Sequence, residues 1–288
     1  MSTQYRVGQI INGQYEVRSL IGRGAMADVY LAYDHRLASE VAVKVLRQSV
    51  ARNPEFVQRF RREARVQEMV RHPNVAKLYS DGITNAAEPY LVFELLRGQT
   101  LRSVLRKERQ VPLRRAVNYC NQALQGLAAV HTLGIHHRDL KPANLMLEPG
   151  SGPAEHGAGD RVVLIDFGFA SLEGSRKLTR QGYVVGSLSY MAPERLRDEP
   201  CEAPAEIYSM GVILYELLVG RTPFVAQNDR ELIHAHLSEL PPLPSEVAPE
   251  CGIPAELEDL LLSCLAKEPG ERPQSALELS QALDRELA

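Results

Sequence analysis

The sequence predicts an α+β protein with two lobes: a small N-terminal five-stranded antiparallel sheet with one main helix, and a larger, mainly helical C-terminal lobe. Two periodicities predict this division. Apolar and polar residues alternate with period two as far as Phe93, and apolar positions recur with a period of 3.6 from Leu101 onward. The chain has 288 residues, of which 44% are hydrophobic, so it is long enough to bury a large core.

Strand-like stretches dominate the first part of the chain. Each carries β-branched or aromatic residues between turn signals. They cover residues 15–21, 29–34, 41–46, 76–79 and 90–93. A helical stretch interrupts them after Pro54, and proline is a residue favoured at the first position of a helix. We therefore expect one small sheet with one helix.

Helical stripes characterise the rest of the chain, and a hinge is expected near residues 94–98, where the strand-rich part ends. Three helices show apolar residues on one face. Their stripes are Ala116, Cys120, Ala123, Leu124 and Leu127; Ile207, Met210, Leu214 and Leu217; and Leu257, Leu260, Leu261 and Leu265.

Composition excludes several classes of function. The formal net charge is -3 and the pI is about 6.3, which argues against binding to nucleic acid. The four cysteines have no metal-ligand spacing, and nothing at the N-terminus resembles a signal peptide. No apolar run approaches the roughly 20 residues that span a bilayer. We expect reduced thiols, no membrane segment and a cytoplasmic location.

A lysine on one strand and a glutamate on the helix form a candidate buried pair. Lys44 ends the strand-like run 41–44, on the face opposite its valines. Glu63 lies on the same helical stripe as Phe56 and Phe60 and so faces the sheet. A buried carboxylate is unfavourable unless it is paired. Lys44 is the expected partner of Glu63.

Two glycines separate the first two expected strands. Gly22 and Gly24 flank Arg23, and Val29 follows seven residues after the first glycine. Glycine lets the backbone turn tightly and bring N–H groups close to phosphate oxygens. The same pattern also makes ordinary hairpins, so the glycines alone do not establish a phosphate site.

The segment His137-Arg138-Asp139-Leu140-Lys141-Pro142-Ala143-Asn144, followed 22 residues later by Asp166-Phe167-Gly168, is the most informative feature of the chain. Asp139 can accept the proton of a substrate hydroxyl, and Lys141 can neutralise charge on a phosphoryl group in transfer. Asn144 and Asp166 offer the oxygen ligands that Mg²⁺ prefers. Any one of these residues also fits a surface turn, but their joint order and spacing do not.

These motifs resemble those of eukaryotic-type serine/threonine protein kinases, and the sequence at 60–65 and 71–74 is most similar to that of the bacterial members. The resemblance covers residues 15–283. It implies one kinase domain over 1–288, with an N-lobe at 15–97 and a C-lobe at 98–283. It further implies ATP as the phosphate donor, Mg²⁺ with Mn²⁺ as an alternative ion, and protein substrates.

The resemblance also assigns roles to individual residues. Asp139, Lys141, Lys44 and Glu63 are implied to be catalytic, with Glu63 holding Lys44 against the α- and β-phosphates. Asn144 and Asp166 are implied to bind the metal. The implied nucleotide-binding residues are Ile21, Gly22, Arg23, Gly24, Val29, Ala42, Lys44, Phe93, Glu94 and Leu96. Phe93 would be the gatekeeper, although a plain buried strand fits residues 91–96 equally well.

The activation segment adds a substrate platform and a regulatory site by resemblance. Residues 186–194 match the platform that cradles a protein substrate, with Ser187 in place of threonine. Glu194 and Arg272 match a buried ion pair that braces the large lobe. Thr179 aligns with the autophosphorylated threonine of bacterial relatives, which implies a transient homodimer. A segment that is ordered without modification is the alternative.

Three residues depart from the family pattern. Ala27 stands where relatives have the third glycine, and Gln67 stands where they have an apolar residue of the helix. Glu206 replaces an aspartate that anchors the catalytic loop in relatives. Glu206 follows Pro204 and also suits the first turn of a helix. These departures speak for a pseudokinase scaffold, whereas the intact catalytic set speaks for an active serine/threonine kinase. A small-molecule kinase would lack the platform at 186–194.

Overall fold

The computed structural model describes residues 5–150, 159–166 and 188–287 of the 288-residue chain, although the side chains of a few helical residues, Glu63 among them, are outside this description. Cα packing divides the chain into two compact units. The first contains the chain as far as Arg97 together with Asp166, and the second begins at Gly98.

A six-stranded antiparallel sheet forms the first unit, with the strands in the order β1-β2-β3-β4-β6-β5. Five strands were predicted, so the prediction missed β1, which pairs through only two residues and gives no alternation that the sequence could show. The strands are β1 (Ile10–Ile11), β2 (Tyr15–Arg23), β3 (Ala27–Asp34), β4 (Ser39–Leu46), β5 (Leu78–Ile83) and β6 (Pro89–Glu94).

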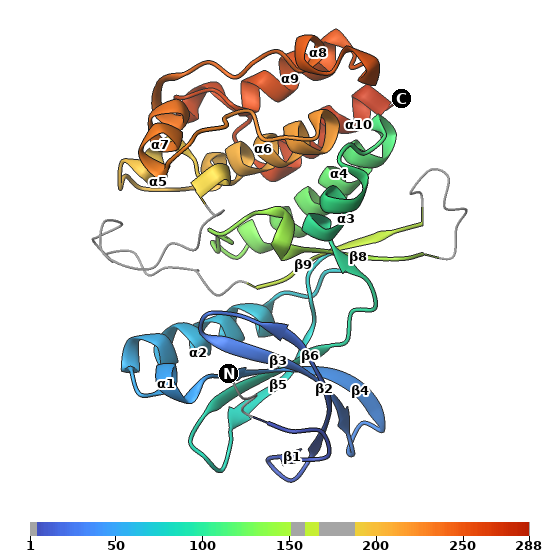
Figure 1. The fold of residues 1–288 in the computed structure, drawn as a ribbon, viewed down its shortest axis with the longest axis vertical. Helices are drawn as coiled ribbons and strands as arrows, with labels where there is room; N and C mark the ends of the chain where they lie inside the picture. Colours follow the sequence, from blue (N-terminus) through green and yellow to red (C-terminus); the bar gives the residue numbers. More distant parts are fainter. Residues whose placement is uncertain (1–4, 151–158, 167–187, 288) are drawn as a thin grey trace. The chain divides into compact units, whose positions relative to one another are not determined.

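Two helices accompany this sheet, α1 (Gln48–Ala51) and α2 (Pro54–Met69), and α2 packs against β5 and β6 (Figure 1). The start of α2 follows from its sequence: the side chain of Asn53 accepts a hydrogen bond from the Glu55 N–H, and Pro54 occupies the first helical position. Phe60 and Ala64 of α2 are buried together with Leu46 and Leu91 of the sheet. The helix predicted after Pro54 is therefore confirmed.

The second unit is mainly helical, as predicted, with a small antiparallel sheet in the order β7-β8-β9. Its strands are β7 (Gln99–Thr100), β8 (Leu145–Glu148) and β9 (Arg161–Leu164). Its α-helices are α3 (Leu101–Glu108), α4 (Leu113–His131), α5 (Pro193–Leu196), α6 (Ala203–Val219), α7 (Asp229–Ser238), α8 (Pro244–Val247), α9 (Ala255–Cys264) and α10 (Ala276–Leu287). The 3-10 turns are η1 (Pro142–Asn144), η3 (Leu188–Tyr190), η4 (Pro249–Cys251) and η5 (Pro269–Glu271).

Helix α6 forms the centre of this unit, and its residues from Ala205 to Val219 are all buried. It packs against α4, α9 and α10 (Figure 1). Gly211 allows the close approach of α9, because a Cβ at this position would lie 2.8 Å from the Cβ of Cys264. The helix ends at Gly220, whose φ of 81° is the left-handed conformation that favours glycine.

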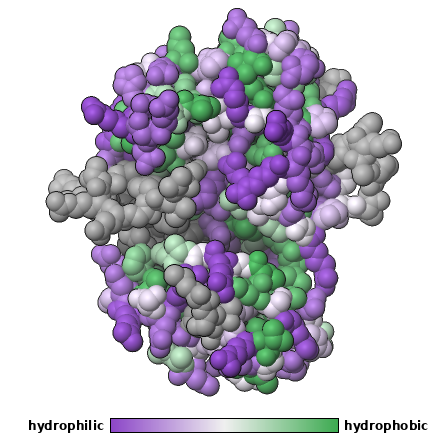
Figure 2. Space-filling view, in the orientation of Figure 1, coloured by the Kyte–Doolittle hydropathy of each residue, from purple (hydrophilic) through white to green (hydrophobic). Residues whose placement is uncertain are grey.

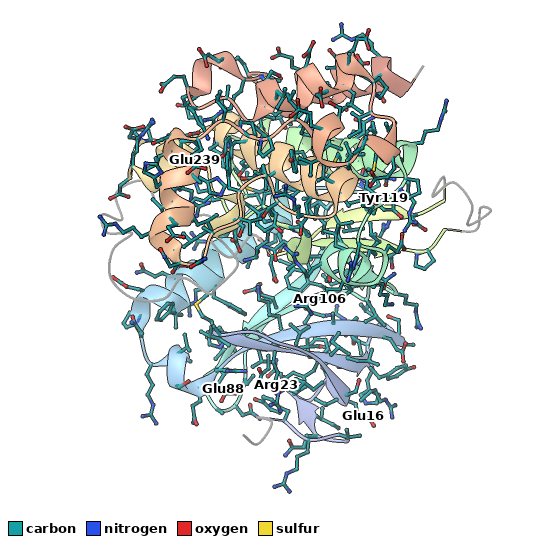
Figure 3. All side chains as sticks on the ribbon, turned by 45° about the horizontal axis from the view of Figure 1, so that its top comes forward. Glu16, Arg23, Glu88, Arg106, Tyr119 and Glu239 are labelled. Carbon is teal, nitrogen blue, oxygen red and sulfur yellow. The ribbon has the colours of Figure 1, made fainter. Side chains whose placement is uncertain are left out.

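Helix α4 also fixes the start of β9. The side chain of Gln122 donates to the Asp160 carbonyl at 2.9 Å and accepts from the Val162 N–H at 2.9 Å. Tyr119, which is labelled in Figure 3, lies on the same helix and donates its hydroxyl to the Asp160 carboxylate. Because β9 leads directly to Asp166, these bonds help to position one end of the segment that carries a predicted metal ligand.

The face drawn in Figure 2 is of mixed hydropathy, with hydrophobic areas lying between hydrophilic ones. Single exposed apolar residues, such as Leu240 and Val225, are usual in globular proteins. Among the residues described here, no helix has the length and apolar character needed to cross a bilayer.

Candidate active site

Three of the predicted site residues meet in the loop between α4 and β8. The ammonium of Lys141 lies 2.7 Å from Oδ2 of Asp139. The amide nitrogen of Asn144 donates to the Asp139 carbonyl at 2.7 Å and to its Oδ2 at 3.1 Å. Both bonds use the nitrogen of the Asn144 amide, so its oxygen is the atom suited to a cation. The loop thus forms one compact cluster of a carboxylate, an ammonium and an amide.

Backbone anchors hold this cluster. Asn144 lies in the turn η1, where its carbonyl accepts from the Ile165 N–H at 3.0 Å. His137 is fully buried and its Nε2 lies 3.0 Å from the Ile165 carbonyl. These contacts tie the catalytic loop to the residue that precedes Asp166. Sequence spacing alone could not reveal this link, because it joins backbone atoms.

Glu206, at the start of α6, is a further anchor of the loop. Its Oε1 accepts from the Arg138 N–H at 2.6 Å, and its Oε2 lies 2.7 Å from Nε2 of His131. Arg138 has a φ of 61°, an unusual conformation for a residue other than glycine. Burial opposes the ionisation of Glu206, yet the hydrogen bond and charge of His131 hold its pKa below the ordinary value. The longer side chain therefore still reaches the loop.

The first unit brings Lys44 and Asp166 together, although 122 residues separate them. The Lys44 ammonium, on β4, lies 2.8 Å from Oδ1 of Asp166 and 5.9 Å from the centre of the Phe60 ring on α2. Asp166 has a φ of 59°. Glu63 belongs to α2, but its side chain is outside the described ones, so its pairing with Lys44 stays a prediction.

The glycine segment forms the turn between β2 and β3. Gly24 donates its N–H to the Ala27 carbonyl at 2.9 Å, and Gly22 pairs with Val29 across the two strands. Ile21 precedes the turn and is half exposed. This hairpin suits a phosphate-binding loop and an ordinary turn alike, so the predicted nucleotide role of its residues, Arg23 included, stays a prediction.

The predicted adenine-binding residues lie on and after β6. Ala42 on β4 is directly opposite Phe93, which confirms that these two residues share a sheet. Glu94 donates its N–H to the Lys77 carbonyl at 2.9 Å, and its Oε1 accepts from the Lys77 N–H at 2.9 Å. Leu96 follows the strand and is partly buried. Their contacts with a base stay predictions.

Gln67, one of the departures from the family pattern, is buried on α2. Only 2% of its surface is exposed, and neither atom of its amide has a hydrogen-bond partner among the described residues. An unsatisfied buried amide destabilises the folded state by about 1–3 kcal/mol. Gln67 therefore weakens the packing of α2, compared with an apolar residue at the same position.

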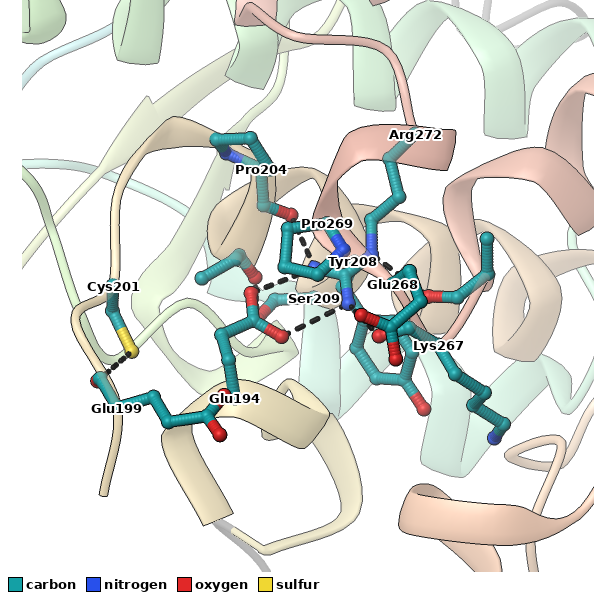
Figure 4. Close-up of polar contacts among 12 residues, drawn as sticks. Glu194, Glu199, Cys201, Pro204, Tyr208, Ser209, Lys267, Glu268, Pro269 and Arg272 are labelled. Carbon is teal, nitrogen blue, oxygen red and sulfur yellow. Dashed lines mark hydrogen bonds and ion pairs between the residues drawn. The ribbon is translucent and has the colours of Figure 1, made fainter. Parts of the chain in front are cut away.

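The predicted ion pair of the helical unit is present. Arg272 binds Glu194 through two parallel bonds of 2.7 and 2.9 Å, and both side chains are buried (Figure 4). The guanidinium also donates to the carbonyls of Pro204, Ala266 and Lys267. This arrangement satisfies both charges inside the protein and links α5 to the chain before α10.

Most of the residues named in the activation-segment predictions are ones that the structure does not describe. Phe167, Gly168, Thr179, Gly186 and Ser187 lie outside the described part of the chain. The platform is described from η3 onward, where the Tyr190 carbonyl accepts from the Ser209 hydroxyl at 2.7 Å.

Comparison with known sequences decides the family. The sequence profile described as "Protein kinase domain" matches residues 15–285. The chain belongs to the protein kinase family. The predicted resemblance is confirmed, and the two-lobed kinase fold with it.

Curated relatives of this kinase domain include bacterial proteins. It is 39% identical over 274 residues to the probable serine/threonine-protein kinase SCO3848 of Streptomyces coelicolor, and the match covers 93% of this chain and 39% of that protein. It is 36% identical over 279 residues to the serine/threonine-protein kinase PknB of Mycobacterium leprae, covering 96% of this chain and 43% of that protein. The chain thus spans less than half the length of these relatives.

A solved structure supports the fold. The crystal structure of the Mycobacterium tuberculosis PknI kinase domain matches with a TM-score of 0.73 and 24% sequence identity, over 98% of this chain and 99% of that one. At this identity the likeness concerns the fold of the kinase domain alone.

Proposed function

We propose that this kinase domain transfers the γ-phosphate of ATP to serine or threonine hydroxyls of protein substrates. The observation that carries the proposal is the cluster of Asp139, Lys141 and Asn144, with contacts of 2.7–3.1 Å. The relatives named as serine/threonine kinases support the choice of hydroxyl. For this chain we propose a single kinase domain, with an N-lobe at 15–97 and a C-lobe at 98–283.

Each residue has a role in this proposal. Oδ2 of Asp139 is engaged by Lys141 and Asn144, so we assign Oδ1 to accept the proton of the substrate hydroxyl. Lys141, held beside this carboxylate, neutralises charge on the phosphoryl group in transfer. Lys44, which lies only 13% exposed, orients the nucleotide phosphates.

The donor atoms fit a divalent metal bound with the nucleotide. The oxygen of the Asn144 amide and the carboxylate of Asp166 are hard ligands, which suit Mg²⁺ or Mn²⁺. When bound, ATP and the metal supply the phosphoryl group and neutralise its charge. Four free cysteines support our proposal of a cytoplasmic location, where ATP is available.

Transfer of labelled phosphate tests the function. The domain is incubated with Mg²⁺ and ATP, and with either a generic basic protein or a panel of small alcohols, and phosphoamino acids are then identified. We expect phosphoserine and phosphothreonine in the protein. Phosphorylation of the alcohols alone would indicate a small-molecule kinase. ATP binding without any transfer would indicate a pseudokinase. The departure at Gln67, whose buried amide has no partner in the part of the chain that the structure describes, favours that alternative.

Replacement of Lys44 by methionine tests the lysine role. We expect activity to fall by about 10²-fold or more, because the nucleotide phosphates lose their positioning group. If Glu63 is a buried partner, the variant also loses about 3 kcal/mol of stability, and Lys44→Met/Glu63→Leu recovers it without recovering activity. Denaturant unfolding and initial rates measure both effects.

The matched control for this experiment is Lys77→Met, at an exposed position of the same unit. It should keep the parent activity and stability. A Lys44→Met variant that unfolds like the parent would show that Glu63 is not buried against Lys44, because the pair with the half-exposed Asp166 contributes little to stability.

Autophosphorylation of Thr179 is a further part of the proposal. Arg138 directly precedes Asp139, and a phosphate opposite a guanidinium can order a loop through charge-assisted bonds. We expect incubation with Mg²⁺ and ATP to phosphorylate Thr179 and to raise activity several-fold, and Thr179→Ala to prevent both. Mass spectrometry and initial rates decide: an unmodified threonine, or an alanine variant as fast as the phosphorylated parent, removes this site from the proposal. A transient homodimer is the arrangement that would allow transfer between molecules.

A further inference from the structure

Three side chains capable of binding a metal gather beside the catalytic loop. His131 is the last residue of α4, His136 follows five residues later, and Glu206 belongs to the first turn of α6. One ligand atom from each lies within 4.8 Å of the others. All three belong to the helical unit, so they form a site within one compact body.

One member of the cluster is buried and the two histidines are half-buried. Glu206 is 3% exposed, and the imidazole rings of His131 and His136 lie 4.9 Å apart between centroids. His131 and Glu206 contact each other directly at 2.7 Å. Nδ1 of His136 is buried and has no hydrogen-bond partner among the described residues. Buried polar atoms nearly always have a hydrogen-bond partner or another ligand, so a bound ligand would account for this nitrogen.

There is room for a small ligand at this point. A cavity of about 10 Å³ is lined by His136 and Glu206, together with Cys201, Glu202, Arg138 and Arg195, and His131 is not among its lining residues. This volume is close to the space that one water molecule needs. A metal ion on the cavity side of His136 and Glu206 can therefore take its fourth ligand from water within the cavity.

Charged groups of both signs surround His136. The carboxylates of Glu206 and Glu202 attract positive charge at this ring, whereas His131 and Arg138 oppose it. Arg195 also lines the cavity beside the ring. What favours a metal ion here is the placement of the three ligand atoms and the Nδ1 of His136, which has no hydrogen-bond partner among the described residues.

We propose that His131, His136 and Glu206 bind a divalent transition-metal ion, with Zn²⁺ as the best fit, at a site separate from the nucleotide-bound metal. Two imidazoles and one carboxylate plus water form a tetrahedral set that suits Zn²⁺, whereas Mg²⁺ prefers oxygen ligands alone. With bonds of roughly 2.0–2.2 Å, two ligand atoms of one ion lie at most about 4.4 Å apart, so a group spread over as much as 4.8 Å has to close slightly around the ion.

Binding would change the environment of the catalytic loop. The ion replaces the hydrogen bond between His131 and Glu206, and any proton on the His131 Nε2 is released to solvent. Oε1 of Glu206 keeps its bond to the Arg138 N–H. The metal site is therefore connected through one carboxylate to the residue before Asp139.

Metal titration tests the proposal. The nucleotide-free chain, without any affinity tag and in excess Mg²⁺ to occupy oxygen sites, is titrated with Zn²⁺ against a chromophoric chelator. We expect one equivalent to bind, and His136→Leu to weaken this binding by at least about tenfold. Affinity in the parent should fall as the pH is lowered from 7.5 to about 5.5, because protons compete for the imidazoles. Substitution with Co²⁺ should give the visible absorption of a four-coordinate site.

Two control variants make the result specific. His234→Ala removes a histidine that is 70% exposed, and Cys201→Ser removes the thiol that lines the cavity. Both should bind like the parent. His136→Gln serves as a second variant if the leucine variant does not fold, which circular dichroism reports. Equal affinity in the parent and the folded His136 variant overturns the proposal, as does binding that depends on Cys201 and not on His136.

Discussion

Asp139→Ala is expected to lower kcat by roughly 10²- to 10⁴-fold, with little change in nucleotide affinity, because it removes the acceptor of the substrate proton and leaves the phosphate-binding groups in place. Asp166→Asn should abolish turnover, because it removes the charged ligand of the metal. Asparagine tolerates the φ of 59° at this position, so the backbone need not change. Steady-state rates and nucleotide titration measure these effects.

Asp259→Ala, at an exposed position of α9, is the matched control and should behave like the parent. Melting curves establish that each variant is folded. An Asp139→Ala variant with the parent kcat would refute the role of this carboxylate. An Asp166→Asn variant that still turns over would place the charged metal ligand elsewhere.

Arg272→Leu should destabilise the protein by about 3–5 kcal/mol, because it leaves the Glu194 carboxylate buried without its bidentate partner. The carbonyls of Pro204, Ala266 and Lys267 lose a donor at the same time. Denaturant unfolding of the whole chain measures the loss.

A double replacement and a surface pair provide the comparison. Arg272→Leu/Glu194→Leu should recover a large part of the stability, since no buried charge remains. Arg97 and Glu40 are joined at 2.5 Å, but the arginine side chain is 75% exposed, so Arg97→Leu should change stability by less than about 1 kcal/mol. An Arg272→Leu variant as stable as the Arg97→Leu variant would contradict the structural role of the buried pair.

The fold was largely predictable because its elements are long enough to show their period. The stripe on α4 and the alternation along β4 each extend over many residues. The strand β1 was missed because two residues cannot show an alternation. The predicted strand at 76–79 begins later, at Leu78, since strand ends depend on pairing with β6 as well as on residue type.

The site was predictable where its residues are close in the chain. Asp139, Lys141 and Asn144 lie within six positions, and the loop that holds them together is short. The contact between Lys44 and Asp166 depends on packing across 122 residues, and no local pattern in the sequence indicates it. The same holds for the contact of Glu206 with His131, which joins the end of one helix to the start of another.

The left-handed backbone at Arg138 and Asp166 restricts how this protein can be made thermostable. Each such residue other than glycine carries on the order of 1–3 kcal/mol of strain. Glycine would relieve that strain, but it would also loosen the two segments that carry the reactive groups. Ala38 and Ala87 have the same backbone conformation in exposed hairpin turns far along the chain from these segments. Glycine can replace Ala38 or Ala87 to gain stability. Arg138 and Asp166 should be kept, because a gain in stability at these two positions would lower activity.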